Sequence, residues 1–413
     1  MKKNYKEINK CRISKSTNLK TILDLGEHYL TGVFPKKKDE VITKGPLELS
    51  WCEESGLVQL KHSFDPNEMY GSNYGYRSGL NKSMVEHLKF KVERLKSLNI
   101  LNDNDVVLDI GSNDGTLLSF YKNLSLNKYG MDPTAGKFRD YYDKDITIIE
   151  NFFSKDNFLK NSKNKKAKIV TSIAMFYDLE DPSKFVSDIN GILDEEGIWH
   201  FEQSYLPTML RMNSYDTICH EHVEYYTLNV VNKLLEKNDL KIINVELNSI
   251  NGGSFAVTAA KKNSSLNTNT ELVNWLIEHE KRMALNTLKP YESFKKRVFK
   301  HREDLKDLIK NIKASGKNIA GYGASTKGNV LLQFCDLSEN EISCIAEVNK
   351  EKFGSFTPGT NIPIMSEEEV KKKNPDYMLV LPWHFRDDII KREQEYLKSG
   401  GRLIFPLPEI EVI

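Results

Sequence analysis

Short apolar runs separated by helical stretches dominate the middle of this 413-residue chain. Strands that alternate with helices are typical of βαβ units around a parallel sheet. The pattern therefore predicts an α/β domain over residues 96–265. The runs that are apolar enough for buried strands are residues 106–110, 128–132, 146–150, 168–173, 197–202, 240–247 and 254–260.

The pattern changes on both sides of this domain. Residues 1–95 combine short strand-like pieces, a tyrosine-rich stretch and a helix that begins near Leu80, which predicts a small N-terminal domain. Residues 266–315 are charged and helical in period, and they predict a helical connector. Strand runs and glycines resume in residues 316–413, so we expect a second, smaller α/β domain there.

Composition and charge narrow the function classes. The chain has 59 basic and 58 acidic residues, which argues against the basic face that a nucleic-acid-binding protein needs. No apolar run approaches the ~20 residues of a membrane span, and the first residues lack the apolar segment of a signal peptide. The five cysteines are scattered and odd in number, so we expect reduced thiols and a cytoplasmic protein.

The first candidate for chemistry is VVLDIGSNDGTLL, residues 106–118, which predicts a strand, a tight turn and the start of a helix. Gly111 and Gly115 would let a ligand approach the backbone, and the helix would present free N–H groups. A dinucleotide pyrophosphate would favour G-x-G-x-x-G at this point. Asp109 and Asp114 would instead repel a diphosphate, and they suit a ligand that carries a sulfonium and an ammonium.

Residues after the next two strands complete this candidate site. Asp132 ends the second strand, where a carboxylate can accept both hydroxyls of a ribose. Phe153 follows the third strand and could meet an adenine, although it suits the core equally well. Together with Asn113 in the turn, these residues predict a site for S-adenosylmethionine. An NAD site and a purely structural turn are the alternatives.

The second candidate is YDTICHEHVEYY, residues 215–226, which packs two histidines, three acids and three tyrosines together. Its His220, Glu221 and His222 could be metal ligands, a general base with its helper, or part of a polar loop. No third ligand lies nearby in the sequence, so we predict no metal here.

These motifs, with others along the full length, resemble the three-domain sugar C-methyltransferases, which methylate C3 of nucleotide-linked 4-keto-deoxysugars. The resemblance implies a class I methyltransferase Rossmann-like, doubly wound α/β sheet and a C-terminal Rossmann-like α/β domain. It also implies a nucleotide-diphosphate sugar as the partner, and we expect a monomer or homodimer. The further stretches that carry it include LDLGEHYLTGVF (23–34), YGYRSGLNKSM (74–84), FEQSYLPTML (201–210), NGGSFAVT (251–258), GYGASTKGNVLLQF (321–334) and VLPWHF (380–385).

C-methylation needs a carbanion, which a ketone at C4 makes accessible by acidifying the C3 proton. His222 is the predicted base, Glu221 would orient it or share its task, and His220 would support it or contact the substrate. Tyr76 and Tyr74 are candidate donors to the enolate oxygen. The family has a tyrosine where this chain has Cys219, and a thiol donates a weaker hydrogen bond than a phenol.

The resemblance places the nucleotide sugar on the C-terminal domain. Hydroxyl and ammonium groups at the start of a predicted helix suit a diphosphate, while Trp383 would stack and His384 would donate a hydrogen bond near the substrate. Arg77 suits a phosphate, a sugar or a surface ion pair. A Rossmann-like domain with an empty site is the alternative. The candidate substrate-binding residues are Tyr74, Arg77, Ser325, Thr326, Lys327, Trp383 and His384.

Members of this family carry a structural zinc in the N-terminal domain, held by two C-x-x-C pairs. Here the pairs read CRIS (11–14) and CEES (52–55), with serine as the second member of each. Neutral hydroxyl groups are poor zinc ligands, so we predict a zinc-module-like domain without zinc.

Together, the residues and the resemblance predict an S-adenosylmethionine-dependent methyltransferase that acts at C3 of a nucleotide-linked 4-keto-deoxysugar. The alternatives are an O- or N-methyltransferase on the same scaffold, an NAD-dependent oxidoreductase, and a non-catalytic binding protein. Asp109 and Asp114 argue against the oxidoreductase, whereas Cys219 makes the non-catalytic protein more plausible.

Overall fold

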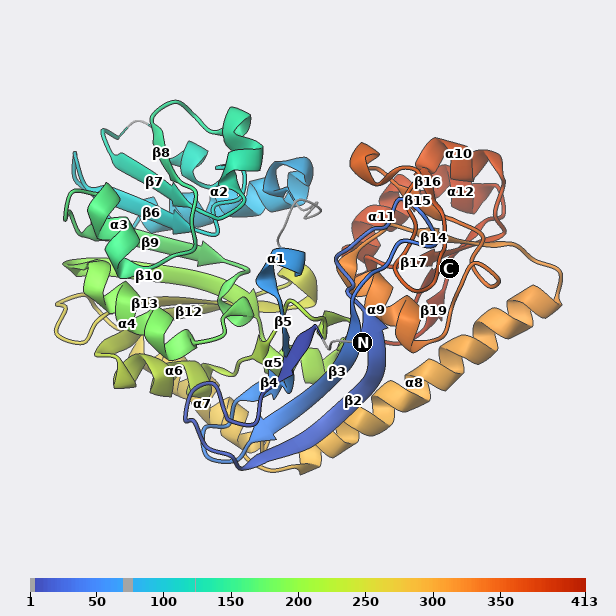
Figure 1. Cartoon of the computed structure of the whole chain (residues 1–413), viewed down its shortest axis with the longest axis horizontal. Coiled ribbons are helices and arrows are strands. Elements are labelled where there is room, and N and C mark those ends of the chain that lie inside the picture. The colour runs from blue at the N-terminus through green and yellow to red at the C-terminus, as the bar shows by residue number, and fades with distance from the viewer. Residues whose placement is uncertain (1–3, 70–76, 123) are drawn as a thin grey trace.

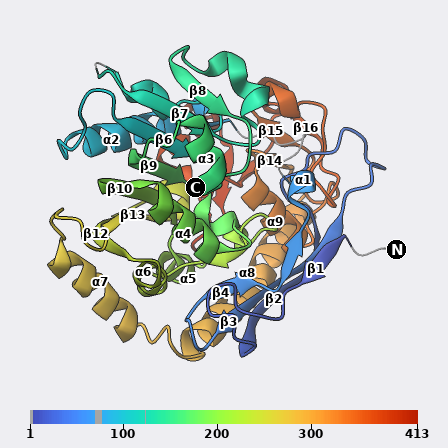
Figure 2. The same cartoon turned by 60° about the vertical axis from the view of Figure 1, so that its left-hand side comes forward.

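The computed structural model describes residues 4–69, 77–122 and 124–413, and within them the chain forms two α/β lobes (Figure 1). The central lobe lies at the left of Figure 1 and the C-terminal lobe at the right. The N-terminal sheet and the long helix α8 (Lys289–Ala314) run along the lower side and join them. Figure 2 shows α8 beside the N-terminal sheet.

The central lobe is built on a sheet of order β12-β13-β10-β9-β6-β7-β8. Strand β13 runs antiparallel to β10 and β12, and the other neighbours pair in parallel. Each strand overlaps a predicted run, so this sheet is confirmed. The strands are β6 Val106–Ile110, β7 Asn127–Met131, β8 Ile146–Ile149, β9 Ala167–Ile173, β10 Leu193–Ser204, β12 Leu240–Asn248 and β13 Ser254–Lys261.

Helices cover both faces of this sheet, which makes it doubly wound. Leu108 faces the apolar cluster with α3, α4, α6 and α7, while Val107 faces the cluster with α2. Burial on both faces explains why β6 reads as a continuous apolar run. The helices are α2 Lys82–Lys96, α3 Lys155–Asn161, α4 Pro182–Ile192, α5 Leu206–Arg211, α6 Leu228–Lys237 and α7 Thr270–Arg282.

We expected a helix directly after the glycine turn, and this prediction is wrong. The chain forms only a 3-10 turn there, Leu118–Phe120. Leu117 and Leu118 enter the apolar cluster beneath α2, so α2 covers the face of the sheet that the expected helix would have covered. The turn therefore lacks the macrodipole of an α-helix, and ligand binding there depends on side chains and loop amides.

The N-terminal sheet has the order β11-β4-β3-β2. Its edge strand β11 (Glu224–Tyr225) comes from the middle of the chain, directly after His220–His222. The sheet thus holds the H-E-H stretch against the N-terminal domain. The remaining elements are β1 Tyr5–Glu7, which pairs with β5 His62–Phe64, and β2 Leu19–Tyr29, β3 Lys44–Cys52, β4 Val58–Leu60 and α1 Pro66–Met69.

The C-terminal lobe has a sheet of order β16-β15-β14-β17-β18-β19, in which β19 is antiparallel to β18. The sequence predicted that strands resume in residues 316–413, and this parallel sheet with its antiparallel edge strand bears that out. The elements are β14 Ile319–Tyr322, α9 Thr326–Phe334, β15 Ile345–Glu347, β16 Ile364–Ser366, α10 Glu367–Lys372, β17 Tyr377–Val380, α11 Arg386–Arg392, α12 Gln394–Lys398, β18 Arg402–Phe405 and β19 Glu411–Val412.

The segment predicted as a connector consists of two helices with different partners. Helix α7 packs on α6 and β12 of the central lobe, whereas α8 contacts β2. Buried residues of α8 recur every three or four positions, which gives it an apolar stripe. Its buried His301 lies 3.0 Å from the Tyr215 hydroxyl and 2.5 Å from the Pro406 carbonyl oxygen, so α8 links both lobes.

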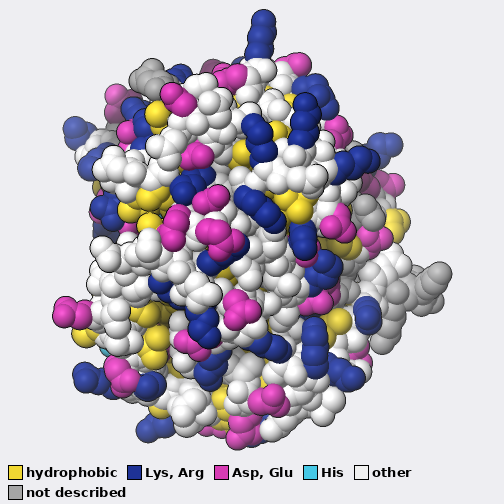
Figure 3. All heavy atoms as spheres, turned by 90° about the vertical axis from the view of Figure 1, so that its left-hand side faces the viewer, with side chains coloured by type: hydrophobic (Ala, Val, Ile, Leu, Met, Phe, Trp, Pro, Cys, Tyr) yellow, Lys and Arg dark blue, Asp and Glu magenta, His cyan; other side chains and the backbone are white. Residues whose placement is uncertain are grey.

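The distribution of charged side chains on the surface agrees with the near-zero net charge. Figure 3 shows acidic and basic side chains interspersed over the face that the central lobe presents. Among the described residues, no helix combines the length and the apolar character that crossing a membrane requires.

A buried carboxylate fixes α7 to the start of α6, and its removal should destabilise the fold. Glu280 accepts hydrogen bonds from the Tyr205 hydroxyl (2.6 Å) and from the backbone N–H groups of Leu228 (2.6 Å) and Asn229 (2.9 Å). We expect Glu280→Ala to lower the free energy of unfolding by about 2–4 kcal/mol, because three donors lose their acceptor. Urea denaturation measures this, with exposed Glu278→Ala as the control. Equal losses in the two variants would contradict the assignment.

Candidate active site

The predicted cofactor residues meet at the carboxyl ends of β6 and β7. Gly111, Asn113 and Gly115 all have positive φ angles, of 73°, 50° and 76°. A Cβ atom on Gly111 would lie 3.1 Å from the Met175 side chain, and one on Gly115 would lie 2.7 Å from the Tyr142 ring. Both glycines are therefore required by backbone conformation and by the lack of space.

Asp109 is a buried carboxyl group at the end of β6, with an exposed fraction of 4%. Its Oδ1 accepts a hydrogen bond of 2.6 Å from the Thr171 hydroxyl. Burial raises the pKa of Asp109 to about 7, the Thr171 hydrogen bond opposes this, and the charge of Asp132 adds to it. A cation bound nearby would favour the ionised form, so Asp109 suits a positively charged ligand.

Asp132 lies just past the end of β7 and already holds the surrounding loops. Its Oδ2 accepts from the Asn113 N–H at 2.9 Å, and its Oδ1 accepts from the N–H and the hydroxyl of Thr134 at 2.6 Å. A carboxylate has about four acceptor positions, so about one remains for a ribose hydroxyl.

Asn113 and Asp114 also dock the segment that precedes α2. The Ser78 N–H donates to Asn113 Oδ1 and the Gly79 N–H donates to Asp114 Oδ2, both at 2.9 Å. Arg77 lies 4.0 Å from Asp114 and its guanidinium lies 4.1 Å from the Tyr141 ring centroid. Arg77 therefore has intramolecular partners at the cofactor loop. Tyr74 and Tyr76, the predicted enolate donors, lie outside the described residues.

Phe153 is the predicted adenine contact. It is partly buried and packs edge-on against Phe185 of α4, with 5.0 Å between ring centroids. Part of its surface stays open while the ring anchors the loop after β8.

The H-E-H stretch sends its three side chains into three different environments. His220 is buried against the N-terminal domain, where its ring meets Phe64 edge-on at 4.5 Å. Glu221 lies so close to Gly32 that a Cβ atom added to Gly32 would overlap the Glu221 carboxylate. His222 is half-buried, and its ring lies 4.2 Å from the Tyr177 ring centroid. The hydrogen bond of His222 runs to the Thr217 carbonyl rather than to Glu221.

The tautomer of His222 follows from that hydrogen bond. Nδ1 lies 2.9 Å from the Thr217 carbonyl oxygen, which can only accept. Neutral His222 therefore carries its proton on Nδ1 and its lone pair on Nε2. Burial lowers the pKa of His222 to about 4, the Thr217 carbonyl opposes this, and the positive charge of Lys327 adds to it. His222 is thus neutral near pH 7 and able to accept a proton.

Cys219, which stands where the family has a tyrosine, is fully buried. Burial raises the pKa of its thiol, and the charge of Glu221 raises it further. The thiol hydrogen-bonds to the Glu221 side chain, which contributes to the pKa of Glu221. Because Cys219 points toward Glu221, it is poorly placed to replace a phenol that would face the substrate.

The C-terminal glycine loop faces the central lobe. Ser325 caps α9 and accepts from the Gly328 N–H at 3.0 Å. Thr326 lies near the carboxylate of Glu221 at Gly32. Lys327 donates from Nζ to the Asn251 carbonyl oxygen at 2.5 Å, so it reaches the loop before β13.

Trp383 and His384, the last two predicted substrate residues, lie beside this lysine. Trp383 is buried, and its indole N–H donates to Asp216 Oδ2 at 2.7 Å. His384 is half-buried and its ring lies 4.3 Å from that of Phe385. Burial lowers the pKa of His384 to about 3, and the charge of Lys327 contributes.

Two residues that the sequence analysis missed contribute to the surroundings of Lys327. Asp216 and Asn251 stand in stretches that carry the family resemblance, but neither was assigned a role. Asn251 has a φ of 55° and precedes two glycines, which marks a tight loop after a strand. Asp216 adjoins the histidine stretch in sequence, yet only the fold shows that it meets the C-terminal lobe.

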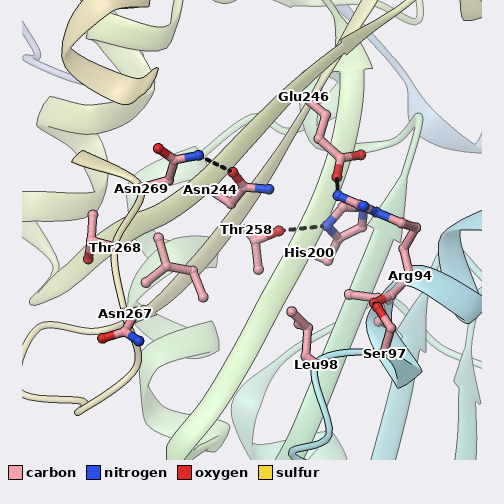
Figure 4. Close-up of a pocket in the computed structure, with 12 residues that line it drawn as sticks. Arg94, Ser97, Leu98, His200, Asn244, Glu246, Thr258, Asn267, Thr268 and Asn269 are labelled. Atoms are coloured by element: carbon pink, nitrogen blue, oxygen red, sulfur yellow. Dashed lines mark hydrogen bonds and ion pairs between the residues drawn. The ribbon is translucent and has the colours of Figure 1, made fainter. Parts of the chain in front are cut away.

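A separate hollow of about 390 Å³ lies between α2 and the strands β10, β12 and β13 (Figure 4). Arg94 pairs with Glu246 at its rim at 2.6 Å, and His200 lies 2.9 Å from the Thr258 hydroxyl. None of the predicted site residues lines it. The strand ends therefore remain the candidate site.

The four positions of the family zinc site come together in the N-terminal domain. Cys11 Sγ lies 3.1 Å from Ser55 Oγ, and Ser14 Oγ lies 3.6 Å from Cys52 Sγ. Two thiols and two neutral hydroxyls do not fit the closed four-ligand set that structural zinc requires. Within the described ranges, no group of three or more His, Cys, Asp or Glu side chains is arranged to hold a metal.

Comparisons with known proteins match successive parts of the chain. The matching family models are described as "Putative zinc binding domain" over residues 11–70, "Methyltransferase domain" over 84–245 and "C-methyltransferase C-terminal domain" over 249–408. The chain is 29% identical to the C-methyltransferase NovU of Streptomyces niveus over 409 residues, which cover 98% of this chain and 97% of NovU.

Solved structures are similar over part of the chain. An O-methyltransferase family protein from Burkholderia thailandensis matches with 15% identity and a TM-score of 0.35, over 45% of this chain and 59% of its own. Magnesium protoporphyrin IX methyltransferase from Synechocystis, solved with bound S-adenosylmethionine, matches with 14% identity and a TM-score of 0.32, over 43% of this chain and 79% of its own.

The raised pKa of Asp109 predicts pH-dependent binding of S-adenosylmethionine. In the free protein Asp109 is mostly protonated below pH 7, whereas a cationic ligand favours its ionised form. Binding therefore releases a proton, and affinity should rise about tenfold between pH 6 and pH 7.5. Isothermal calorimetry measures this. Asp109→Asn should abolish the pH dependence and exposed Asp143→Asn should keep it; retention in Asp109→Asn would contradict the assignment.

The serine-for-cysteine replacements predict a protein without structural zinc that two substitutions can convert. Expressed in zinc-supplemented medium, the unaltered chain should hold far less than one zinc per chain. The double variant Ser14→Cys and Ser55→Cys should bind about one, because it restores four thiolates. Elemental analysis gives the count, with each single variant as a control. Stoichiometric zinc in the unaltered protein would refute the prediction.

Proposed function

Because the chain belongs to the S-adenosylmethionine-dependent C-methyltransferase family, we propose that its substrate is a nucleotide-linked 4-keto-deoxysugar and that C3 receives the methyl group. The observation that carries this proposal is the state of His222. Its Nδ1–H is fixed on the Thr217 carbonyl, so Nε2 is available as a base. A general base is what carbon methylation requires and what a simple binding site does not.

The central lobe would hold the cofactor at the ends of β6 and β7. Asp132 would accept from the ribose, Asp109 would face the cationic end, and Gly111 and Gly115 leave room for close approach. When bound, S-adenosylmethionine supplies an electrophilic methyl group. The nicotinamide alternative finds no support in these acids, which disfavour a diphosphate.

The substrate would lie where His222 faces the C-terminal lobe. Nε2 of His222 takes the C3 proton, and the electrons of the C3–H bond are delocalised onto the C4 oxygen. The lowered pKa of His222 keeps it neutral until the substrate arrives. Glu221 supports this base by holding the loop against Gly32 rather than by sharing the proton. His220 anchors the same loop to the N-terminal domain.

An exchange experiment tests this assignment. The protein is incubated in heavy water with S-adenosylhomocysteine and thymidine diphosphate 4-keto-6-deoxyglucose, or its guanosine and cytidine diphosphate counterparts, and deuterium at C3 is followed by NMR. The unaltered protein should exchange C3, and His222→Ala should slow exchange by at least ~100-fold. His279→Ala, at an exposed position of α7, serves as the matched histidine control.

The outcomes separate the alternatives. No exchange with any of these sugars, in a protein that binds S-adenosylmethionine by calorimetry, would overturn the 4-keto-sugar proposal. Methyl transfer without C3 exchange would indicate an O- or N-methyltransferase. Equal exchange in His222→Ala would remove His222 as the base.

A further inference from the structure

Lys327 was expected to bind a diphosphate, but its side chain goes elsewhere. It stands in the first turn of α9 in the C-terminal lobe, and its Nζ crosses to the Asn251 carbonyl of the central lobe at 2.5 Å. An ammonium carries three donors, so two remain for other partners. The residue is half-buried, which leaves it accessible to a small ligand.

The surroundings of Lys327 disfavour a diphosphate. The Asp216 carboxyl group is buried nearby, and the charges of Asp216 and Lys327 act on each other's pKa values. Trp383 engages only one of the Asp216 oxygens, at 2.7 Å, and Oδ1 has no hydrogen-bond partner among the described residues. This buried carboxyl group would repel a diphosphate, which carries two negative charges, more strongly than a single oxygen on which negative charge develops.

Lys327 instead lies close to the general base, because α9 packs against the turn Tyr215–Thr217 that holds the His222 ring. Its charge acts on His222, and it also acts on Cys219, the position where the family has a tyrosine. Among the described residues it is the one charged side chain that affects the pKa of His222. Asp216 lies within the short turn Tyr215–Thr217, which packs against α9, and the His222 ring is tied to the same turn through the Thr217 carbonyl. Base, lysine and carboxylate thus form one cluster where the lobes meet.

We propose that Lys327 is a catalytic residue whose ammonium donates to the C4 oxygen of the sugar and stabilises the enolate, with Asp216 and the Asn251 carbonyl as its positioning residues. This inference rests on the proposed function. It supplies the donor that the replacement of tyrosine by Cys219 removed. An ammonium is a stronger donor to an oxyanion than a thiol, and it acts in a partly water-excluded site.

The charges balance through the reaction. His222 Nε2 accepts the C3 proton while the electron pair moves onto the C4 oxygen, where the Lys327 ammonium faces it. The enolate offsets the positive charge that otherwise disfavours a protonated His222. When C3 accepts the methyl group, the C4 carbonyl re-forms and the electron pair of the broken methyl–sulfur bond stays on sulfur. His222 then loses its proton to water.

Two readouts test this role in the full-length protein. The first is C3 deuterium exchange with saturating thymidine diphosphate 4-keto-6-deoxyglucose and its guanosine and cytidine counterparts, in the presence of S-adenosylhomocysteine. Lys327→Met should slow exchange at least ~100-fold, and Lys327→Arg should slow it less. Lys352→Met is the matched control, since Lys352 donates at 2.7 Å to the Ala324 carbonyl of the same loop but faces Phe34.

The second readout is the pKa of His222, followed by NMR on histidine-labelled protein and assigned with His222→Gln. In Lys327→Met it should rise by ~1 unit, and in Lys352→Met it should not move. This measurement needs no sugar. An unchanged pKa in Lys327→Met would overturn the pairing of Lys327 with the base.

Other outcomes also decide the matter. Normal exchange in Lys327→Met, with at least ~10-fold weaker binding of thymidine diphosphate, would make Lys327 a diphosphate ligand and overturn the inference. If Lys327→Met lowers the melting temperature and the S-adenosylmethionine affinity together with the rate of exchange, Lys327 would be a structural link between the lobes. If the unaltered protein exchanges the C3 hydrogen of none of these sugars, the proposed function fails. The enolate role of Lys327 then fails with it, even where the pKa of His222 shifts.

Discussion

The pairing of β11 with β4 is the constraint on which the candidate site depends. Glu224 and Tyr225 pair with Gln59 and Val58, so a segment from the middle of the chain completes the N-terminal sheet. The H-E-H stretch lies immediately before this pairing and cannot move independently of it. A short backbone ladder thus sets the direction of His222, although its residues carry no chemistry themselves.

This constraint explains why the site was only partly predictable. The strands of the central lobe were read correctly, because residues buried on both faces give continuous apolar runs. The glycine turn was recognised because positive φ angles and close contacts leave few alternatives to glycine. The helix after the turn was wrong, since α2, which precedes it in sequence, covers the sheet at that point.

The directions of side chains in irregular segments were harder to predict from the sequence. Glu221 and His222 are neighbours in sequence and were expected to work as a pair, but the loop between Thr217 and β11 sends them to different sides. Lys327 was assigned to a phosphate by the logic of helix starts, and a contact with Asn251, far away in sequence, overrides that logic. No local pattern reports such contacts between lobes.

Helix α8 adds a geometric requirement of its own. It runs unbroken from Lys289 to Ala314 and carries the C-terminal lobe, with its buried residues committed to one face. Each residue of an α-helix advances ~1.5 Å and turns ~100°. One inserted or deleted residue would therefore swing the C-terminal lobe about this axis, and Lys327 would leave the side of His222. The number of residues in α8 therefore sets the orientation of the C-terminal lobe. Related chains that keep this chemistry should change the amino acids of this helix more readily than its length.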